Sequence, residues 1–95
     1  MTGKERAGWR KLANTLSPIF QIGKSDIGDA MVDAIDAALE KRELIKISVL
    51  DTAGISARDA AEMLSAALNA EVIQCIGRRF VLYRESQDKD KKDRK

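Results

Sequence analysis

Histidine is absent from this 95-residue chain, and cysteine, proline, tryptophan and tyrosine each occur once. Without histidine, the chain lacks the commonest general base and metal ligand of proteins. A single cysteine cannot form an internal disulfide bond or the cysteine pairs of a zinc site, and a lone free thiol is typical of the cytoplasm. These absences argue against an enzyme, a metal site and a cofactor, and they predict a cytoplasmic protein.

Long hydrophobic runs are also missing, since no stretch approaches the roughly 20 apolar residues that cross a bilayer. Residues 1–11 are charged but no apolar segment follows them, so no signal peptide is predicted. Neither a P-loop nor the glycine motif of dinucleotide-binding proteins occurs. We therefore expect no membrane partner and no small-molecule substrate, and we expect a single core because the chain is short.

Charge is unevenly distributed along the chain, although the net charge is only +2. Basic residues predominate in 1–24 and 71–95, whereas acidic residues predominate in 25–70. This segregation predicts a basic side and an acidic side, and a basic side suits a polyanionic partner. Residues 86–95 contain no apolar side chain, so we expect a folded domain of residues 1–85 followed by a disordered charged tail, 86–95.

Hydrophobic periodicity predicts helices and strands in the order α-β-α-β-α-β-β. Two right-handed β-α-β crossovers and a final hairpin would place them in a two-layer α/β domain with one mixed four-stranded sheet. The run 43–50 is rich in β-branched residues and indicates a central strand. The predicted helices span 5–16, 26–41 and 56–69, and the other predicted strands span 18–22, 72–76 and 80–83.

Each predicted helix has an apolar face that we expect to pack against the sheet. Cys75 lies in an apolar strand and is expected in the core. The carboxylates of the second helix are expected to form a solvated face rather than a catalytic pair. The predicted apolar faces are Trp9, Leu12, Ala13 and Leu16; Ile27, Met31, Ala34, Ile35, Ala38 and Leu39; and Ala60, Met63, Leu64, Ala67 and Leu68, while the acidic face is Asp26, Asp29, Asp33, Asp36 and Glu40.

The segment Gly23-Lys24-Ser25-Asp26 joins the first predicted strand to the second predicted helix. A glycine here could let backbone N–H groups point at an anion near the positive end of the helix, and Lys24 would add charge for a phosphate. The alternative is a plain turn in which Gly23 supplies an unusual φ and Ser25 or Asp26 caps the helix. Considered alone, the segment favours the plain turn.

Two adjacent arginines, Arg78 and Arg79, occupy the predicted hairpin turn after Gly77. Exposed arginines on a turn commonly do no more than stay hydrated. They would contribute to a phosphate-binding surface only if the fold brings them close to Lys24 and the first helix.

Taken in order, several segments resemble the YhbY-like domain, also called the CRM domain (chloroplast RNA splicing and ribosome maturation). The resemblance implies a fold like the C-terminal domain of bacterial translation initiation factor three. It also implies association with precursors of the large ribosomal subunit for stand-alone bacterial members, and a GxxG loop that clamps the nucleic-acid backbone. In this chain Asp26 replaces the second glycine of that loop. The resemblance covers residues 5–84, and its matching segments are 12–16 with Pro18, 21–24, 38–40, 43–47, 72–77 and 82–84.

The sequence therefore predicts a monomeric RNA-binding protein that assists assembly of the large ribosomal subunit. The alternative is a protein-interaction module on the same fold, with weakened loop-dependent RNA binding and a contact through the acidic helix or an exposed sheet face. A DNA-binding protein of the Alba-like kind ranks last because no specific feature supports it. The expected RNA-binding residues are Arg6, Arg10, Lys11, Gly23, Lys24, Ser25, Arg78 and Arg79.

Overall fold

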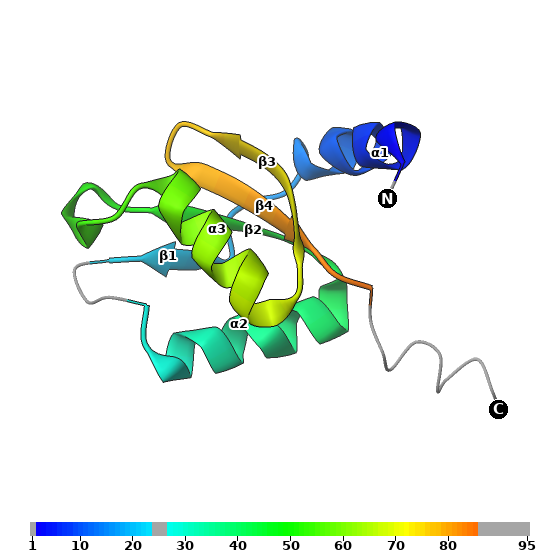
Figure 1. Cartoon of the computed structure of the whole chain (residues 1–95). Coiled ribbons are helices and arrows are strands. Elements are labelled where there is room, and N and C mark those ends of the chain that lie inside the picture. Colours follow the sequence, from blue (N-terminus) through cyan, green and yellow to red (C-terminus); the bar gives the residue numbers. More distant parts are fainter. Residues whose placement is uncertain (1, 24–26, 86–95) are drawn as a thin grey trace, which may run out of the picture.

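A computed structural model describes residues 2–23 and 27–85, which form one four-stranded sheet with helices packed against it (Figure 1). Lys24, Ser25 and Asp26 of the predicted loop, and the predicted tail, lie outside the described residues. The predicted element order and mixed α/β sheet are confirmed. The elements are α1 (Gly3–Ala13), β1 (Phe20–Ile22), α2 (Asp29–Arg42), β2 (Leu44–Val49), the short 3-10 helix η1 (Asp51–Ala53), α3 (Ala57–Leu68), β3 (Glu71–Ile76) and β4 (Arg79–Tyr83).

The sheet has the strand order β1-β2-β4-β3, so β2 and β4 are its inner strands. β2 runs parallel to β1 and antiparallel to β4, which places Ile47 between Phe20 and Phe80. β3 forms one edge and pairs with β4 through a register shift between Val72 and Gln74. The β-branched run therefore forms an inner strand, as its composition predicted.

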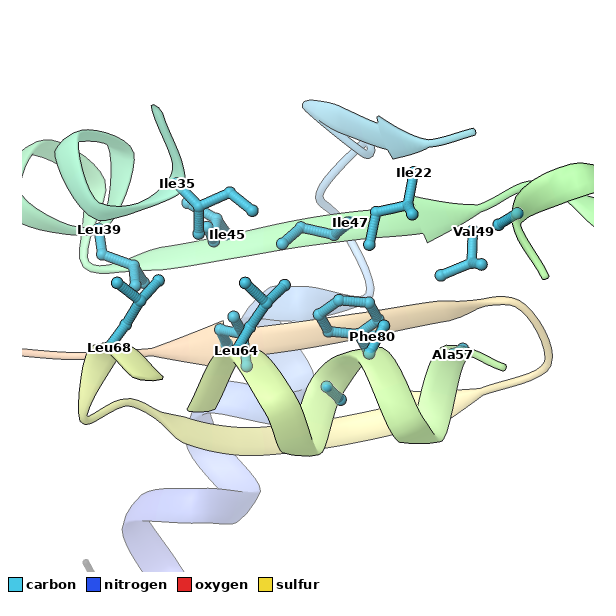
Figure 2. Close-up of a cluster of buried hydrophobic side chains, with 14 residues drawn as sticks. Ile22, Ile35, Leu39, Ile45, Ile47, Val49, Ala57, Leu64, Leu68 and Phe80 are labelled. Carbon is cyan, nitrogen blue, oxygen red and sulfur yellow. The ribbon is translucent and has the colours of Figure 1, made fainter. Parts of the chain in front are cut away.

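The main core lies between one face of the sheet and the helices α2 and α3. Figure 2 shows side chains from β1, β2, β4 and both helices pointing toward one another, with Phe80 and Leu64 near the centre. The sheet-facing positions of α3 include Ala57, Ala60 and Ala61, whose small side chains let the helix lie close to the strands. Ser56 caps this helix by accepting a hydrogen bond from the Asp59 backbone N–H at 3.1 Å.

The helix α1 packs against the opposite face of the sheet and makes a second, smaller core. Trp9 stacks on Tyr83 with ring centroids 4.4 Å apart, and Ala13 is fully buried. A capping box between Thr2 and Glu5 holds the first turn of α1. Helices thus cover both faces of the sheet, whereas the predicted two-layer arrangement has them on one face. α1 covers the end where β2 begins and β4 ends.

Some residues predicted to be buried are exposed in the structure. Leu12 is 54% exposed and Met63 is 50% exposed, because each lies at the margin of its helix's contact with the sheet. Cys75, expected in the core, is exposed because β3 is an edge strand, and the thiol borders a shallow cavity beside Arg58 and Glu62. The predicted apolar residues that are exposed are Leu12, Ala34, Met63, Ala67 and Cys75.

The acidic face of α2 is only partly solvated, because two of its carboxylates bind Arg84. The Arg84 guanidinium donates to Asp36 Oδ1 at 2.7 Å, to Glu40 Oε1 at 3.2 Å and to the Leu68 carbonyl at 3.0 Å. Only 16% of the Arg84 side chain is exposed. Asp36 and Glu40 therefore tie α2 to the residue that follows β4 and to the end of α3.

Tyr83 is the only tyrosine of the chain, so its titration can be followed without interference. Burial, and then the negative charges of Glu43, Glu85 and Glu5, raise the pKa of the Tyr83 phenol above its ordinary value of 10.0. Since folding raises this pKa, the stabilisation is complete below the unfolded pKa and is lost as the pH rises through the folded pKa.

We therefore expect the phenolate absorbance of the native protein to appear at higher pH than that of the protein unfolded in urea. The free energy of unfolding should also decline once the pH exceeds about 10. A native midpoint equal to or below the denatured midpoint would contradict the burial of Tyr83 beneath α1.

Candidate nucleic-acid interface

The end of β1, the connection after β2 and the β3–β4 turn meet at one end of the sheet, on the left of Figure 1. The Leu50 backbone N–H donates to the Ile22 carbonyl at 2.9 Å, and the Val49 N–H donates to the Arg78 carbonyl at 2.7 Å. The residue after β1, the connection after β2 and the β3–β4 turn therefore lie side by side. This end of the sheet contains Gly23, Arg78 and Arg79 from the predicted site.

Gly23 does not supply the unusual φ considered for it, because its φ lies outside the left-handed region. Among the described residues, a Cβ at this position would meet only the Leu50 side chain, at an ordinary 3.7 Å. The second helix also begins later than predicted: α2 starts at Asp29, after Gly28 in extended conformation as its N-cap. Gly23 is therefore not adjacent to a helix N-terminus, and neither backbone strain nor internal packing requires a glycine there.

The two hairpin arginines have different environments. Gly77 has a φ of +60°, which allows the tight turn, and Arg78 in that turn pairs with the Asp51 carboxylate. Arg79 is the first residue of β4 and is exposed, with no ion pair among the described residues. Phe80 next to it is buried beneath α2 and α3, so alternation along the strand turns Arg79 toward the opposite face.

Arg6 on α1 is bound within the domain. Its guanidinium donates to the Val72 carbonyl at 2.7 Å and to the Glu71 carboxylate at 2.9 Å. These contacts fasten α1 to the start of β3. The structure thus gives Arg6 a structural role, and its predicted contact with RNA stays a prediction.

Arg10 and Lys11, in the last turn of α1, are exposed and form no ion pair within the described residues. Arg10 lies one turn after Arg6 and one turn before Asn14, whose side-chain oxygen accepts from the Gln74 amide at 3.5 Å. Arg10 therefore projects along the β3 side of α1, and it is available to an external anion.

Part of the sheet face that carries α1 is left uncovered, and apart from Arg79 the sequence-based prediction assigned no RNA contact to its strand residues. Ile47 and Phe80 point into the main core, so Lys46 and Ser48 point the other way. Lys46 is half-buried and forms no ion pair among the described residues. The alternation of charged and β-branched residues in 43–50 could have identified Lys46 as a residue of this face. The strand register aligns Gln21, Ser48, Arg79 and Ile76 in one cross-strand row.

The charged residues segregate between the two sides of the sheet, and this arrangement corresponds to the acidic excess of 25–70 and to the basic excess of the first helix. The α1 side carries more basic residues than acidic ones, whereas α2 and α3 carry more acidic residues than basic ones. The α1 side has Lys4, Arg6, Arg10, Lys11, Lys46 and Arg79 against Glu5 and Glu71, while α2 and α3 have Asp29, Asp33, Asp36, Glu40, Asp59 and Glu62 against Lys41, Arg42 and Arg58.

The predicted site is therefore divided into two parts. Gly23, Arg78 and Arg79 lie at one end of the sheet, whereas α1 contacts the start of β3 and the end of β4 at the other. The uncovered sheet face, with Lys46, lies between them. Within residues 2–23 and 27–85, no cluster of carboxylates and cysteine is arranged to hold a metal ion. No helix in the same residues is long and apolar enough to cross a membrane.

The sequence is similar to one protein family and to several known proteins. The family model of the CRS1/YhbY (CRM) domain matches residues 1–84. A Bacillus subtilis protein named as a probable RNA-binding protein, YqeI, is 43% identical over 88 residues, which cover 93% of this chain and 92% of that protein. A Methanocaldococcus jannaschii protein, also named as a probable RNA-binding protein, is 31% identical over 88% of this chain and 63% of its own length.

A solved structure shows the same fold. The solution structure of a Staphylococcus aureus protein, described as a candidate RNA-binding protein, superposes with a TM-score of 0.72. That protein is 44% identical, and the match covers 92% of this chain and 91% of the other.

Proposed function

Because the chain belongs to the CRS1/YhbY (CRM) domain family, we propose that it is an RNA-binding protein that associates with precursors of the large ribosomal subunit and assists their assembly. It acts as a monomer in the cytoplasm, without a cofactor and without catalysing a reaction. The observation that carries the proposal is the gathering of unpaired basic side chains on the α1 side of the sheet.

Electrostatics supports an RNA partner for this side of the molecule. Arg10, Lys11, Lys46 and Arg79 form no ion pair among the described residues, so no internal salt bridge has to break before they contact phosphate. The acidic helices α2 and α3 lie behind the sheet and would repel a polyanion that approached from their side. A bound RNA would therefore approach α1 and the uncovered strands.

The environment of Gly23 supports an RNA contact at the end of the sheet that also contains Arg78 and Arg79. Its φ does not require a glycine, and among the described residues a Cβ there would meet only the Leu50 side chain, at an ordinary 3.7 Å. A residue without a side chain permits the close approach of a ligand's backbone. In the proposed complex, Gly23 lets a phosphodiester backbone pass close to the end of β1, with Lys24 and Ser25 as further contacts.

The proposal predicts salt-dependent binding of large-subunit ribosomal RNA fragments by the full chain. Because the contacts are mainly to phosphates, log K should fall linearly with log salt, by roughly 0.7 per contact with unpaired RNA. Contacts from the four unpaired basic residues would give a slope of about −3. Fluorescence anisotropy of labelled fragments over a salt series measures it.

The control for RNA selectivity is DNA of the same sequence, which should bind more weakly. Absence of RNA binding at low salt would contradict the proposed function. Sedimentation of cell extract tests the assembly role, because the protein should migrate with precursors of the large subunit. A protein that migrates with particles but binds no RNA would support the protein-interaction alternative instead.

A further inference from the structure

We propose that the uncovered half of the sheet face binds a single-stranded segment of RNA, with Lys46 and Arg79 contacting successive phosphates. This inference rests on the proposed function and deepens it, because it names the form of RNA and assigns the strands as a binding surface. The surface is bounded by the β3–β4 turn at one end and by the last turn of α1 at the other.

The strand register places Lys46 and Arg79 at a separation that lets both contact one RNA strand. Lys46 pairs with Val81 and Arg79 pairs with Ser48, so Lys46 and Arg79 are diagonal neighbours on adjacent antiparallel strands. Their Cβ atoms are therefore about 7–8 Å apart. That separation is comparable with the spacing of successive phosphates along an extended single strand, so both side chains can contact one strand.

The neighbouring side chains suit an unpaired strand better than a duplex. Ile76, beside Arg79 in the cross-strand row, is 66% exposed and offers an apolar surface for a sugar or the face of a base. Gln21 lies two strands from Arg79 in the same row, and its amide can donate to and accept from a base edge. A free base face and a free Watson–Crick edge both require bases that are not already paired, as in other sheets that bind single-stranded RNA.

No unpaired carboxylate occupies the cross-strand row in the described part of the chain. Two carboxylates that border the face are engaged: Asp51 pairs with Arg78, and Glu71 pairs with Arg6. The Ser48 hydroxyl donates to the Phe20 carbonyl at 3.5 Å. Within the described residues, an approaching phosphate therefore has no ion pair of Lys46 or Arg79 to displace.

The surface is continuous with α1. Gln74 lies opposite Val81 on β3, and its amide contacts Asn14 just after the last turn of α1. Arg10 is one turn earlier on the same side of that helix. A strand that crosses Arg79 and Lys46 can thus continue toward Arg10, which connects the two separated parts of the site.

The test compares two double neutralisations in the full chain, with a short oligouridylate as the probe. Lys46→Gln/Arg79→Gln removes two positive charges from the sheet face, and Arg42→Gln/Arg58→Gln removes two from α2 and α3. We expect the first variant to bind at least tenfold more weakly at low salt, with a log–log salt slope smaller by about 1.4, at about 0.7 per lost contact. The second variant should bind like wild type.

Two further measurements keep the test decisive. Arg79→Gln alone, at an exposed position, should lower the slope by about 0.7 even if replacement of half-buried Lys46 disturbs the fold. Amide chemical shifts of the wild-type protein should change at Gln21, Ser48 and Ile76 when the oligouridylate binds. Thermal unfolding and Trp9 fluorescence establish that each variant is folded.

The outcomes separate this inference from the proposed function. If wild type binds RNA but both sheet variants keep its affinity and salt slope, the sheet surface is overturned and the RNA-binding function stands. Equal affinity for the oligouridylate and for its duplex with oligoadenylate would overturn the assignment to single strands. If wild type binds no RNA at all, the proposed function itself fails.

Discussion

Replacing Ile47 by alanine is expected to lower the free energy of unfolding by about 2–5 kcal/mol. Ile47 is fully buried in the inner strand β2, and its register partners are Phe20 and Phe80. Truncation removes buried methyl groups and leaves a cavity that rigid neighbours from both adjacent strands cannot readily fill. In a domain of this size, the loss is a large fraction of the expected total stability of roughly 5–15 kcal/mol.

Urea unfolding followed by Trp9 fluorescence measures this loss, with thermal unfolding as a second readout. Each kcal/mol should lower the melting temperature by about 4–8 °C in a domain of this size. The matched control is Ile76→Ala, the same substitution at a position that is 66% exposed, which should change stability by less than about 0.5 kcal/mol. Equal effects of the two substitutions would contradict the central position of β2.

Replacing both Arg10 and Lys11 by glutamate should weaken RNA binding about a hundredfold at low salt. A charge-assisted contact contributes about 1.5–3 kcal/mol, so the loss of each one costs about tenfold in affinity. The substitutions also turn two attractions into repulsions. Both side chains are exposed, while Trp9 and Ala13 hold α1 on the sheet, so the fold should persist.

The chain contains a closely matched control for this variant. Lys41 and Arg42 form an adjacent basic pair in the last turn of α2, exposed and without an ion pair in the described residues. Lys41→Glu/Arg42→Glu causes the same change in net charge and the same unfavourable interaction with a helix C-terminus. Salt-titrated binding should therefore show a large loss for the α1 variant and a small one for the α2 variant. Equal losses would mean that net charge, and not a surface on α1, governs binding.

Much of the architecture could be predicted from local sequence. The β-branched run of β2 and the glycine of the β3–β4 turn are short-range features, and each is confirmed. Burial was less predictable at the margins of elements. Met63 and Cys75 have apolar neighbours in sequence, but periodicity gives only the direction of a side chain and not what covers it.

The candidate site was also predictable only in part from local sequence. Arg6 and Arg10 are equivalent in the sequence, one turn apart on a basic helix, and both were predicted to contact RNA. The structure separates them because Glu71 and the Val72 carbonyl, more than sixty residues away along the chain, bind Arg6 alone. Arg78 and Arg79 are adjacent, yet only Arg78 meets Asp51. Lys46 was not predicted as an RNA-binding residue, because a lysine within a strand can contact a ligand only when its face of the sheet is left uncovered.

The sequence by itself determined the order of helices and strands, the inner strand and the charge segregation, because these depend on propensity, periodicity and composition. Only the tertiary structure decided that α1 packs opposite α2 and α3, that it leaves half of a sheet face uncovered, and which basic residues remain unpaired there. Those properties depend on contacts between residues far apart in the chain. Local sequence patterns do not specify such contacts, because residues far apart in the chain meet only when the helices and strands pack together.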